Sequence, residues 1–407
     1  MYRIIILLIA VLPAVLYAQP DVTVKSLLAY PDENVTELPV ITGGKLTIEF
    51  DIEAEYVPQL SIVFRFCDKN WNPTGNLFLA NNGYNIYTDL DYSVLPVSVK
   101  EARYHFSASF PDKRGMISFP FSGKWKFFIT GAYDTSRVYA SGKFVVIKGE
   151  LPMNVSLTKE KLEGGTYFPT ELAYVFNITA DFNLPEKFYP SFVDHMEIIE
   201  NHKTDYPYIV DRISNTNQRQ FYWNGDRKFT FTIRDIRPGN EYRQTDIRDY
   251  NKFTGETVKA QFDGLEYSRF FKEGSPDLNG GEILLNYKND YATYKKVAFS
   301  IRPPNDIYND VFLVGAFNNW EVTPEYKMVQ AGGIYSITTI LKRGIYDYQY
   351  VTGEISGNSV KDIDWYTLEG NDWATANYYY VFLYYNDQDL GGYDHIIGYA
   401  KIYSNKG

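Results

Sequence analysis

The sequence predicts an all-β protein built from antiparallel β-sandwich domains in tandem, and three observations predict it. First, apolar and polar residues alternate along most of the chain, which places apolar side chains on one face of each strand. Second, the 407 residues include 37 Tyr and 27 Phe, side chains that favour pleated sheet. Third, no amphipathic helical stretch of comparable length is present, and Gly, Pro and Asn residues separate the alternating segments.

The alternating segments fall into three successive groups, listed here in chain order: 46–52, 60–66, 104–110 and 125–129; then 174–180 and 229–233; then 297–301, 311–313, 335–341, 346–350 and the aromatic block 378–385. One immunoglobulin-like sandwich takes about 100 residues. We therefore expect an N-terminal sandwich over 19–149, a middle sandwich over 150–273, a Gly- and Pro-containing linker over 274–284, and a third sandwich over 285–407.

The first residues have the pattern of a secretory signal peptide. Arg3 precedes the apolar run 4–12, Pro13 ends that run, and Ala18 stands before Gln19 at the expected cleavage point. The run is shorter than the roughly 20 apolar residues that a membrane-spanning helix needs. We expect residues 1–18 to be removed and the mature chain to be exported, with no membrane span of its own.

Composition and motifs argue against several classes of function. The chain has 40 basic and 50 acidic residues, and its net charge of −10 disfavours nucleic acid as a partner. The single cysteine, Cys67, excludes an intrachain disulfide and a thiolate zinc site, and we expect it to be buried. The four histidines, His105, His195, His202 and His395, show no recognisable metal-ligand spacing, and no hydrolase or phosphate-binding motif is present. We predict a protein with no catalytic residue, metal or cofactor. An enzyme with an aromatic cleft is the alternative, because carboxylates are abundant.

One motif lies in the last third of the chain. Gly315-Ala316-Phe317-Asn318-Asn319-Trp320 is followed by the alternating segment 346–350. This order resembles the early-set sandwich modules that bind glycogen and starch, in which the Trp stacks on a sugar ring. The resemblance implies an early-set-like fold for 285–407, with Trp320 as the sugar platform and Asn377 as a hydroxyl ligand. Gln349 stands where the family has a Lys, and Trp320 as a corner residue that closes the sandwich is the alternative.

Further motifs follow one another through the mature chain. They are Phe66-Cys67-Asp68-Lys69-Asn70-Trp71, Gly239-Asn240-Glu241-Tyr242-Arg243, Asp277-Leu278-Asn279-Gly280, the run from Glu369-Gly370 to Asn377-Tyr378, and Gly392-Tyr393-Asp394. In this order they resemble the type IX secretion system plug protein family of Bacteroidetes-type bacteria. Phe66 and Ala376 replace the His and the Glu usual in that family, which indicates a divergent member.

This second resemblance implies a function without chemistry. It implies a periplasmic subunit, associated with the outer membrane through a partner, that plugs the periplasmic opening of the giant translocon β-barrel when no cargo is present. The alternative is an exported glycan-binding protein. The residues expected to maintain the fold or contact the partner are Cys67, Asp68, Trp71, Gly239, Asn240, Glu241, Arg243, Asp277, Asn279, Gly280, Trp320, Glu369, Gly370, Asn377, Tyr393 and Asp394.

Overall fold

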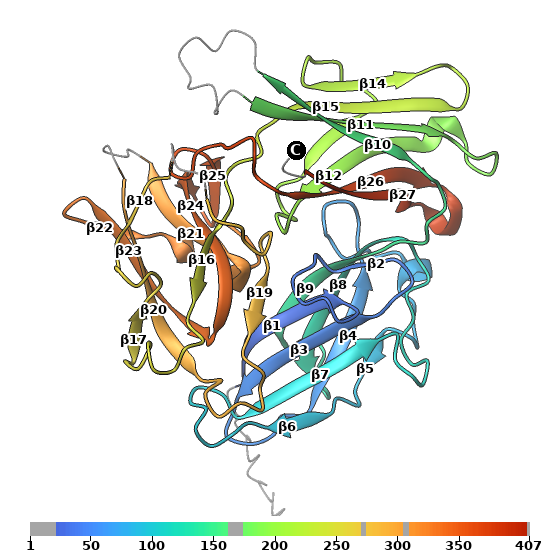
Figure 1. The fold of residues 1–407 in the computed structure, drawn as a ribbon. Coiled ribbons are helices and arrows are strands. Elements are labelled where there is room, and N and C mark those ends of the chain that lie inside the picture. The colour runs from blue at the N-terminus through green and yellow to red at the C-terminus, as the bar shows by residue number, and fades with distance from the viewer. Residues whose placement is uncertain (1–21, 162–173, 270–273, 304–308, 405–407) are drawn as a thin grey trace, which may run out of the picture.

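The structure is a computed structural model that describes residues 22–161, 174–269, 274–303 and 309–404. The expected signal peptide lies outside the described residues. The described chain forms three β-sandwiches, each made of two packed sheets (Figure 1), so the predicted all-β fold is confirmed. Each alternating segment named above lies in a strand. The helices of the described residues are single 3₁₀ turns: η1 Leu77–Leu79, η3 Pro190–Phe192, η4 Ala316–Asn318, η5 Pro324–Tyr326 and η6 Asp389–Gly391.

The N-terminal sandwich covers residues 23–146 and has an aromatic core. Phe50, Phe64, Phe106 and Trp125 are at most 2% exposed and pack between its two sheets. The sheet orders are β1-β3-β7-β6 and β2-β9-β8-β4-β5. The strands are β1 Thr23–Pro31, β2 Val40–Ile41, β3 Leu46–Glu53, β4 Leu60–Phe66, β5 Ile86–Tyr87, β6 Tyr92–Val94, β7 Tyr104–Phe110, β8 Gly123–Gly131 and β9 Val138–Val146.

The middle sandwich combines two distant parts of the chain. One sheet has the order β10-β11-β15-β14, and the other has the order β13-β12-β26-β27, in which the last two strands come from the C-terminal end. In Figure 1 these two red strands lie beneath the green ones. The strands are β10 Asn154–Lys161, β11 Tyr174–Asn183, β12 Val193–Glu200, β13 Tyr208–Asp211, β14 Arg219–Trp223, β15 Lys228–Ile236, β26 Tyr378–Asp387 and β27 Tyr393–Tyr403.

The third sandwich is inserted into the middle one, between β15 and β26. In one sheet the long strand β24 pairs with β16, β19, β21 and β25, and in the other β20 pairs with β17, β18 and β23, which also pairs with β22. The strands are β16 Arg243–Asp246, β17 Thr257–Lys259, β18 Glu266–Tyr267, β19 Glu282–Leu284, β20 Tyr294–Arg302, β21 Asp310–Gly315, β22 Val329–Ala331, β23 Ile334–Lys342, β24 Gly344–Ser356 and β25 Ser359–Asp364.

The division into domains therefore differs from the expected one after residue 150. Strands β16 to β18 belong to the third sandwich and not to the middle one, and β19 places the end of the expected linker 274–284 inside a sheet. Strands β26 and β27 leave the third sandwich and complete the middle one. The physical reason is that alternation identifies a strand but carries no information on which distant strand it pairs with.

Strand β26 is buried on both faces, which explains its almost unbroken aromatic and apolar sequence. Tyr379, Val381 and Leu383 point into the core of the middle sandwich. The residues between them, Tyr380 and Phe382, point the other way, into a second apolar cluster shared with Val40 and Val145 of the N-terminal sandwich. A strand covered on one face alternates between apolar and polar residues, whereas a strand covered on both faces does not.

A buried ion pair joins the N-terminal and middle sandwiches. The Lys124 Nζ of β8 lies 2.9 Å from the carboxylate of Glu197 on β12, and the two side chains are 2% and 1% exposed. The same Nζ donates a hydrogen bond to the Lys69 carbonyl at 2.8 Å and lies over the Trp71 ring. Such a pair is costly to break, because the remaining charge would be buried without a partner.

A second buried ion pair joins the N-terminal and third sandwiches. The carboxylate of Asp51 on β3 accepts from Lys342 Nζ at 2.7 Å and from the Tyr294 hydroxyl at 2.9 Å, and it lies 2.8 Å from His105 Nδ1. The His105 ring also stacks on Tyr287, with ring centroids 3.9 Å apart. Buried charged groups thus join the N-terminal sandwich to the middle sandwich and also to the third sandwich.

Substitutions on the two faces of β26 test its position. We expect Phe382→Ala and Leu383→Ala each to lower the free energy of unfolding by about 3 kcal/mol, because both residues are fully buried. Urea denaturation measures the change. Val329→Ala, at a side chain that is 70% exposed, is the control and should change stability by less than about 0.5 kcal/mol. A Phe382→Ala variant as stable as this control would mean that the outward face of β26 is not covered.

The His105–Asp51 contact predicts a dependence of stability on pH. Burial disfavours the imidazolium, but the hydrogen bond to Asp51 and the Glu49 carboxylate 3.6 Å away outweigh burial and raise the pKa of His105 above 6.5. The stabilisation is therefore complete below about pH 6.5 and is lost as the pH rises through the pKa of the folded state. We expect the stability difference between the wild type and His105→Gln to shrink from pH 6 to pH 9 in urea denaturation. A difference that is constant over this range would contradict the assignment.

Candidate functional site

Seven of the sixteen predicted site residues meet where the chain crosses between the middle and third sandwiches. The outgoing segment, residues 237–242, lies beside the returning segment, residues 369–377. Gly239 N donates to Asn371 Oδ1 at 2.9 Å, and Asn240 Nδ2 donates to the Glu369 carbonyl at 3.0 Å. The sequence placed these motifs about 130 residues apart, and the structure brings them into contact. We call this region, residues 237–243 and 369–377, the crossing.

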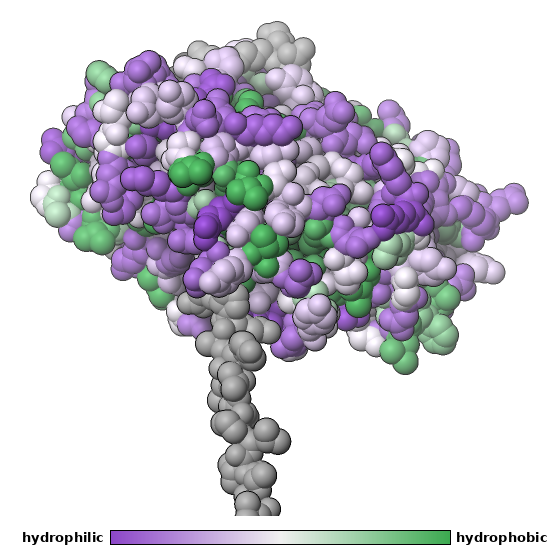
Figure 2. All heavy atoms as spheres, turned by 90° about the horizontal axis from the view of Figure 1, so that it is seen from below, coloured by the Kyte–Doolittle hydropathy of each residue, from purple (hydrophilic) through white to green (hydrophobic). Residues whose placement is uncertain are grey.

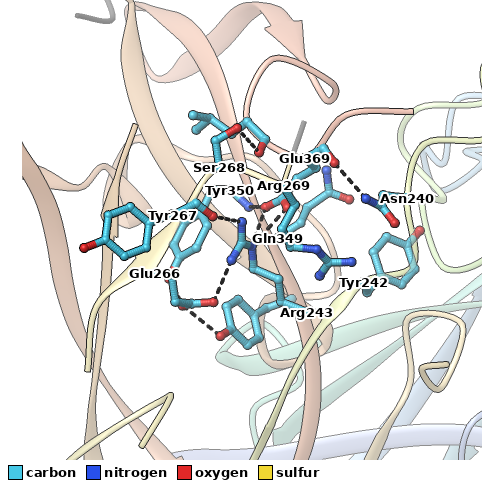
Figure 3. A network of polar contacts seen from close by, with 12 residues as sticks. Asn240, Tyr242, Arg243, Glu266, Tyr267, Ser268, Arg269, Gln349, Tyr350 and Glu369 are labelled. Carbon is cyan, nitrogen blue, oxygen red and sulfur yellow. Dashed lines mark hydrogen bonds and ion pairs between the residues drawn. The ribbon is translucent and has the colours of Figure 1, made fainter. Parts of the chain in front are cut away.

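Arg243 is the centre of a polar network at the crossing (Figure 3). Its Nε donates to both oxygens of Glu369, at 2.9 and 3.0 Å, and its Nη1 donates to Glu266 Oε1 at 2.8 Å. The second Glu266 oxygen accepts from the Tyr348 and Tyr350 hydroxyls at 2.9 and 2.5 Å. One guanidinium therefore links β16, β18, β24 and the returning segment.

The network is buried, so its charges depend on one another. Burial disfavours the charged guanidinium, but the carboxylates of Glu369 and Glu266 outweigh burial and raise the pKa of Arg243 far above its usual value. Arg243, Glu266 and Glu369 are each less than 9% exposed. A cavity of about 10 Å³ lies beside Glu369, which is room for about one water molecule and not for a substrate. The arrangement therefore joins segments of the chain, and the cavity beside it is too small for a substrate.

The Asp277-Leu278-Asn279-Gly280 turn is held by Asp347 of β24. The Asp347 Oδ2 accepts from the backbone N–H groups of Leu278 at 2.7 Å and Gly280 at 3.0 Å. Asp277 accepts from Asn279 N at 2.6 Å and from the N–H of Tyr242. Burial and the neighbouring Asp347 raise the pKa of Asp277, and burial raises the pKa of Asp347 to about 6. Because backbone donors occupy these carboxylates, they fix the turn.

Trp320 is not placed to stack on a sugar. Its side chain is 1% exposed, and its indole Nε1 donates to the Gly280 carbonyl at 2.8 Å. Its ring packs against Tyr242, with centroids 4.2 Å apart. Asn377 is 4% exposed and bonds Asn201 and the Pro238 carbonyl. The expected platform and hydroxyl ligand are thus both interior residues, and Trp320 has the alternative role of a residue that closes the structure.

The remaining motif residues form a second group, between the N-terminal and middle sandwiches. Asp68 Oδ1 accepts from the N–H groups of Asn70 and Asn72, which closes a turn that holds Trp71 at a φ of 66°. Lys69 N donates to Asp394 Oδ2 at 2.8 Å, across 325 residues of chain. Cys67 is buried, and burial raises the pKa of its thiol to about 12, so it stays unreactive.

Tyr393 and Gly370 complete the account of the predicted residues. The half-buried ring of Tyr393 packs edge-on against Phe66, with centroids 5.8 Å apart, so the residue that replaces the usual His is part of this junction. Gly370 lies in the returning segment at a φ of 81°, a left-handed conformation that favours glycine. Glu241 accepts from Ala376 N at 3.0 Å. The predicted residues therefore lie at two junctions between sandwiches.

Several residues of these junctions belong to no motif, and the sequence analysis did not identify them. Glu266 and Asp347 supply the carboxylates that Arg243 and the 277–280 turn need, and Lys124 and Glu197 form the other ion pair. The only pattern that points to them is a charged residue inside a strongly apolar strand, as with Glu197 between Met196 and Ile198.

Two kinds of site are absent from the described residues. No group of three or more His, Cys, Asp or Glu side chains there could hold a metal ion. In the same part of the chain, no helix has the length and apolar character to cross a bilayer.

Comparisons with known proteins bear on the fold. No protein-family profile and no curated protein match this chain. The solved structure of a hypothetical protein from Parabacteroides merdae is similar to it, with a TM-score of 0.74 and 18% identity over 94% of this chain and 98% of that chain. At this identity the likeness shows a common fold alone. A marsupial T cell receptor aligns at 10% identity over 94% of this chain and 98% of its own, but with a TM-score of 0.17.

Replacing Arg243 tests the crossing. We expect Arg243→Met to lower the free energy of unfolding by about 3–5 kcal/mol, because Glu266 and Glu369 would be left buried without a cation. The loss should be smaller at pH 5 than at pH 8, since the freed carboxylates can take up protons. Urea denaturation at both pH values measures this.

A matched arginine provides the control. Arg248 pairs with Asp246 at the surface, where the side chains are 42% and 45% exposed, so Arg248→Ala should cost less than about 1 kcal/mol. Equal losses for the two variants would show that Arg243 is no more important than a surface charge.

Proposed function

We propose that this chain is a non-catalytic periplasmic subunit of a type IX secretion system that plugs the periplasmic opening of the outer-membrane translocon barrel when no cargo is present. The ordered motifs that resemble the plug protein family suggest the role. The observation that carries the proposal is the position of those motifs. Several of them lie at the junctions between sandwiches, where Lys69 N donates to Asp394 and the Tyr242 hydroxyl accepts from Asn201.

A stiff body is what occlusion of a wide opening requires. Buried ion pairs at Asp51 and Lys124 link the N-terminal sandwich to the other two, and each would leave a buried charge without a partner if the domains separated. The energetic cost of opening either junction is therefore large. Release on cargo engagement would then be a competition between two partners for one rigid surface.

The surface suits contact with another protein. Tyr56, Tyr133, Tyr189 and Tyr222 are at least 60% exposed, and Tyr offers a large contact area with a polar tip. On the face shown in Figure 2, apolar side chains form small separate groups among hydrophilic ones. A mixed surface of this kind is typical of interfaces that form and dissociate.

Two measurements test the proposal. An affinity-tagged chain should recover a large outer-membrane barrel from detergent-solubilised membranes. Deletion of the chain should make the outer membrane permeable to small dyes, and its re-expression should restore the barrier. A pull-down without a large barrel, or a dye uptake that deletion leaves unchanged, would count against plugging.

Variants at the crossing distinguish the effect of its rigidity from the effect of having the protein in the periplasm at all. Arg243→Lys keeps a positive charge but loses the planar fork that bonds Glu266 and Glu369 together. At equal periplasmic amounts, checked by immunoblot, we expect cells with Arg243→Lys to take up more dye than cells with Arg248→Ala. Equal uptake would mean that the rigidity of the crossing does not matter for occlusion.

A further inference from the structure

A cavity of about 350 Å³ lies where the three sandwiches meet. Its walls include residues 27–29 and Phe127 of the N-terminal sandwich, His202 of the middle sandwich, and residues 280–282 and Trp320 of the third. Small-molecule sites measure roughly 300–1,000 Å³ and often lie between domains. The volume and the position of this cavity are therefore those of a binding site.

Glycines allow close packing around the cavity. A Cβ on Gly142 would lie 2.3 Å from the Phe127 ring, and a Cβ on Gly281 would lie 2.9 Å from Thr36. Gly280 has a φ of 90°, and its Cβ would lie 3.2 Å from Trp320 Nε1. Larger residues at these three positions would crowd the neighbouring side chains, and glycine allows this close packing.

Glu282 is the unusual polar group of the cavity. It belongs to β19, lines the cavity, and has no hydrogen-bond or ion-pair partner among the described residues. Burial alone raises the pKa of its carboxyl to about 8, so the group is protonated at neutral pH. The other acidic groups of the wall are paired: Glu37 with Lys401 at 2.8 Å, and Glu321 with Lys143 at 2.8 Å.

His202 supplies an acceptor to the same cavity. Its Nε2 lies 3.0 Å from the Thr36 carbonyl, which can only accept, so Nε2 carries the proton. Burial lowers the pKa of His202 to about 4, so the ring is neutral and Nδ1 has a free lone pair. Lys126 is the cation of the wall that forms no ion pair within the described chain. The cavity thus offers acceptors, apolar walls and one free cation.

We propose that this cavity binds a small primary amine, with the ammonium group bonded to the Glu282 carboxylate and a short apolar body against Leu27 and Ala29. An ammonium carries three donors, which matches an unpartnered carboxylate and a neutral imidazole acceptor. Charge-assisted hydrogen bonds are stronger in a buried site than in water. Binding transfers the Glu282 proton to solvent, and the carboxylate formed pairs with the incoming cation.

Calorimetric titration of the full chain with n-butylammonium at pH 7 tests the proposal. We expect binding at least about tenfold tighter than that of 1-butanol or butanoate, because only the ammonium pairs with Glu282. We also expect the heat to depend on the ionisation enthalpy of the buffer, since each binding event releases a proton from Glu282 at pH 7. This dependence should be much weaker at pH 9. Equal affinity for the alcohol, or tighter binding of butanoate through Lys126, would overturn the proposal.

Two matched variants locate the site. Glu282→Gln should lose at least about tenfold in affinity and all of the proton release, because an amide cannot ionise. Glu321→Gln, at a carboxylate of the same wall that pairs with Lys143, should keep both. Butylammonium binding that persists in Glu282→Gln, or no binding by the wild type, would refute the assignment. If Glu282→Gln does not fold, the proton release of the wild type decides.

Discussion

The ion pair of Arg243 with Glu369 and Glu266 is the interaction on which the arrangement of the chain depends. Two covalent connections attach a domain that is inserted between two strands of another domain. Here the two connecting segments, residues 237–242 and 369–377, lie side by side. Arg243 stands at the start of β16 and Glu369 at the end of the inserted sandwich, so their contact closes the insertion into a loop. The backbone groups of both segments are then satisfied by Asn240, Asn371 and Asn377.

Two buried ion pairs between sandwiches follow the same principle. Lys124 and Glu197 join the N-terminal to the middle sandwich, and Asp51 with Lys342 joins the N-terminal to the third. Apolar faces bring these sheets together, but apolar packing tolerates sliding. A buried ion pair permits only one relative position of the two sheets, because any other position leaves a buried charge without its partner. The cavity containing Glu282 lies where the three sandwiches meet, and its unpaired carboxyl is an exception to this rule.

Much of the fold was predictable from the sequence, because strand formation is a local property. The alternation at 46–52 and 60–66 predicted β3 and β4 closely. The pairing of β26 with β12 was not predictable. The paired residues are about 180 positions apart in the sequence, and an alternating pattern does not show which strand is the partner. The motif residues were identified in part, yet the sequence could not show that Gly239 and Asn371 are neighbours. Trp320 looked like a sugar platform because the motif identifies an aromatic ring. The motif does not show that Tyr242 packs against this ring in the folded protein.

The split of the middle sandwich also determines the order in which the chain can fold. Strands β10 to β15 emerge with the second sheet half built, and β26 and β27, which complete it, follow only after residues 237–377 have been made. At about 5–20 residues per second, that interval lasts roughly 7–30 s. During this interval, half of the hydrophobic core of the middle sandwich stays uncovered, and its strands can pair with the wrong partners. The N-terminal sandwich has no such delay, so a holding chaperone would be needed for the middle of the chain and not for its beginning.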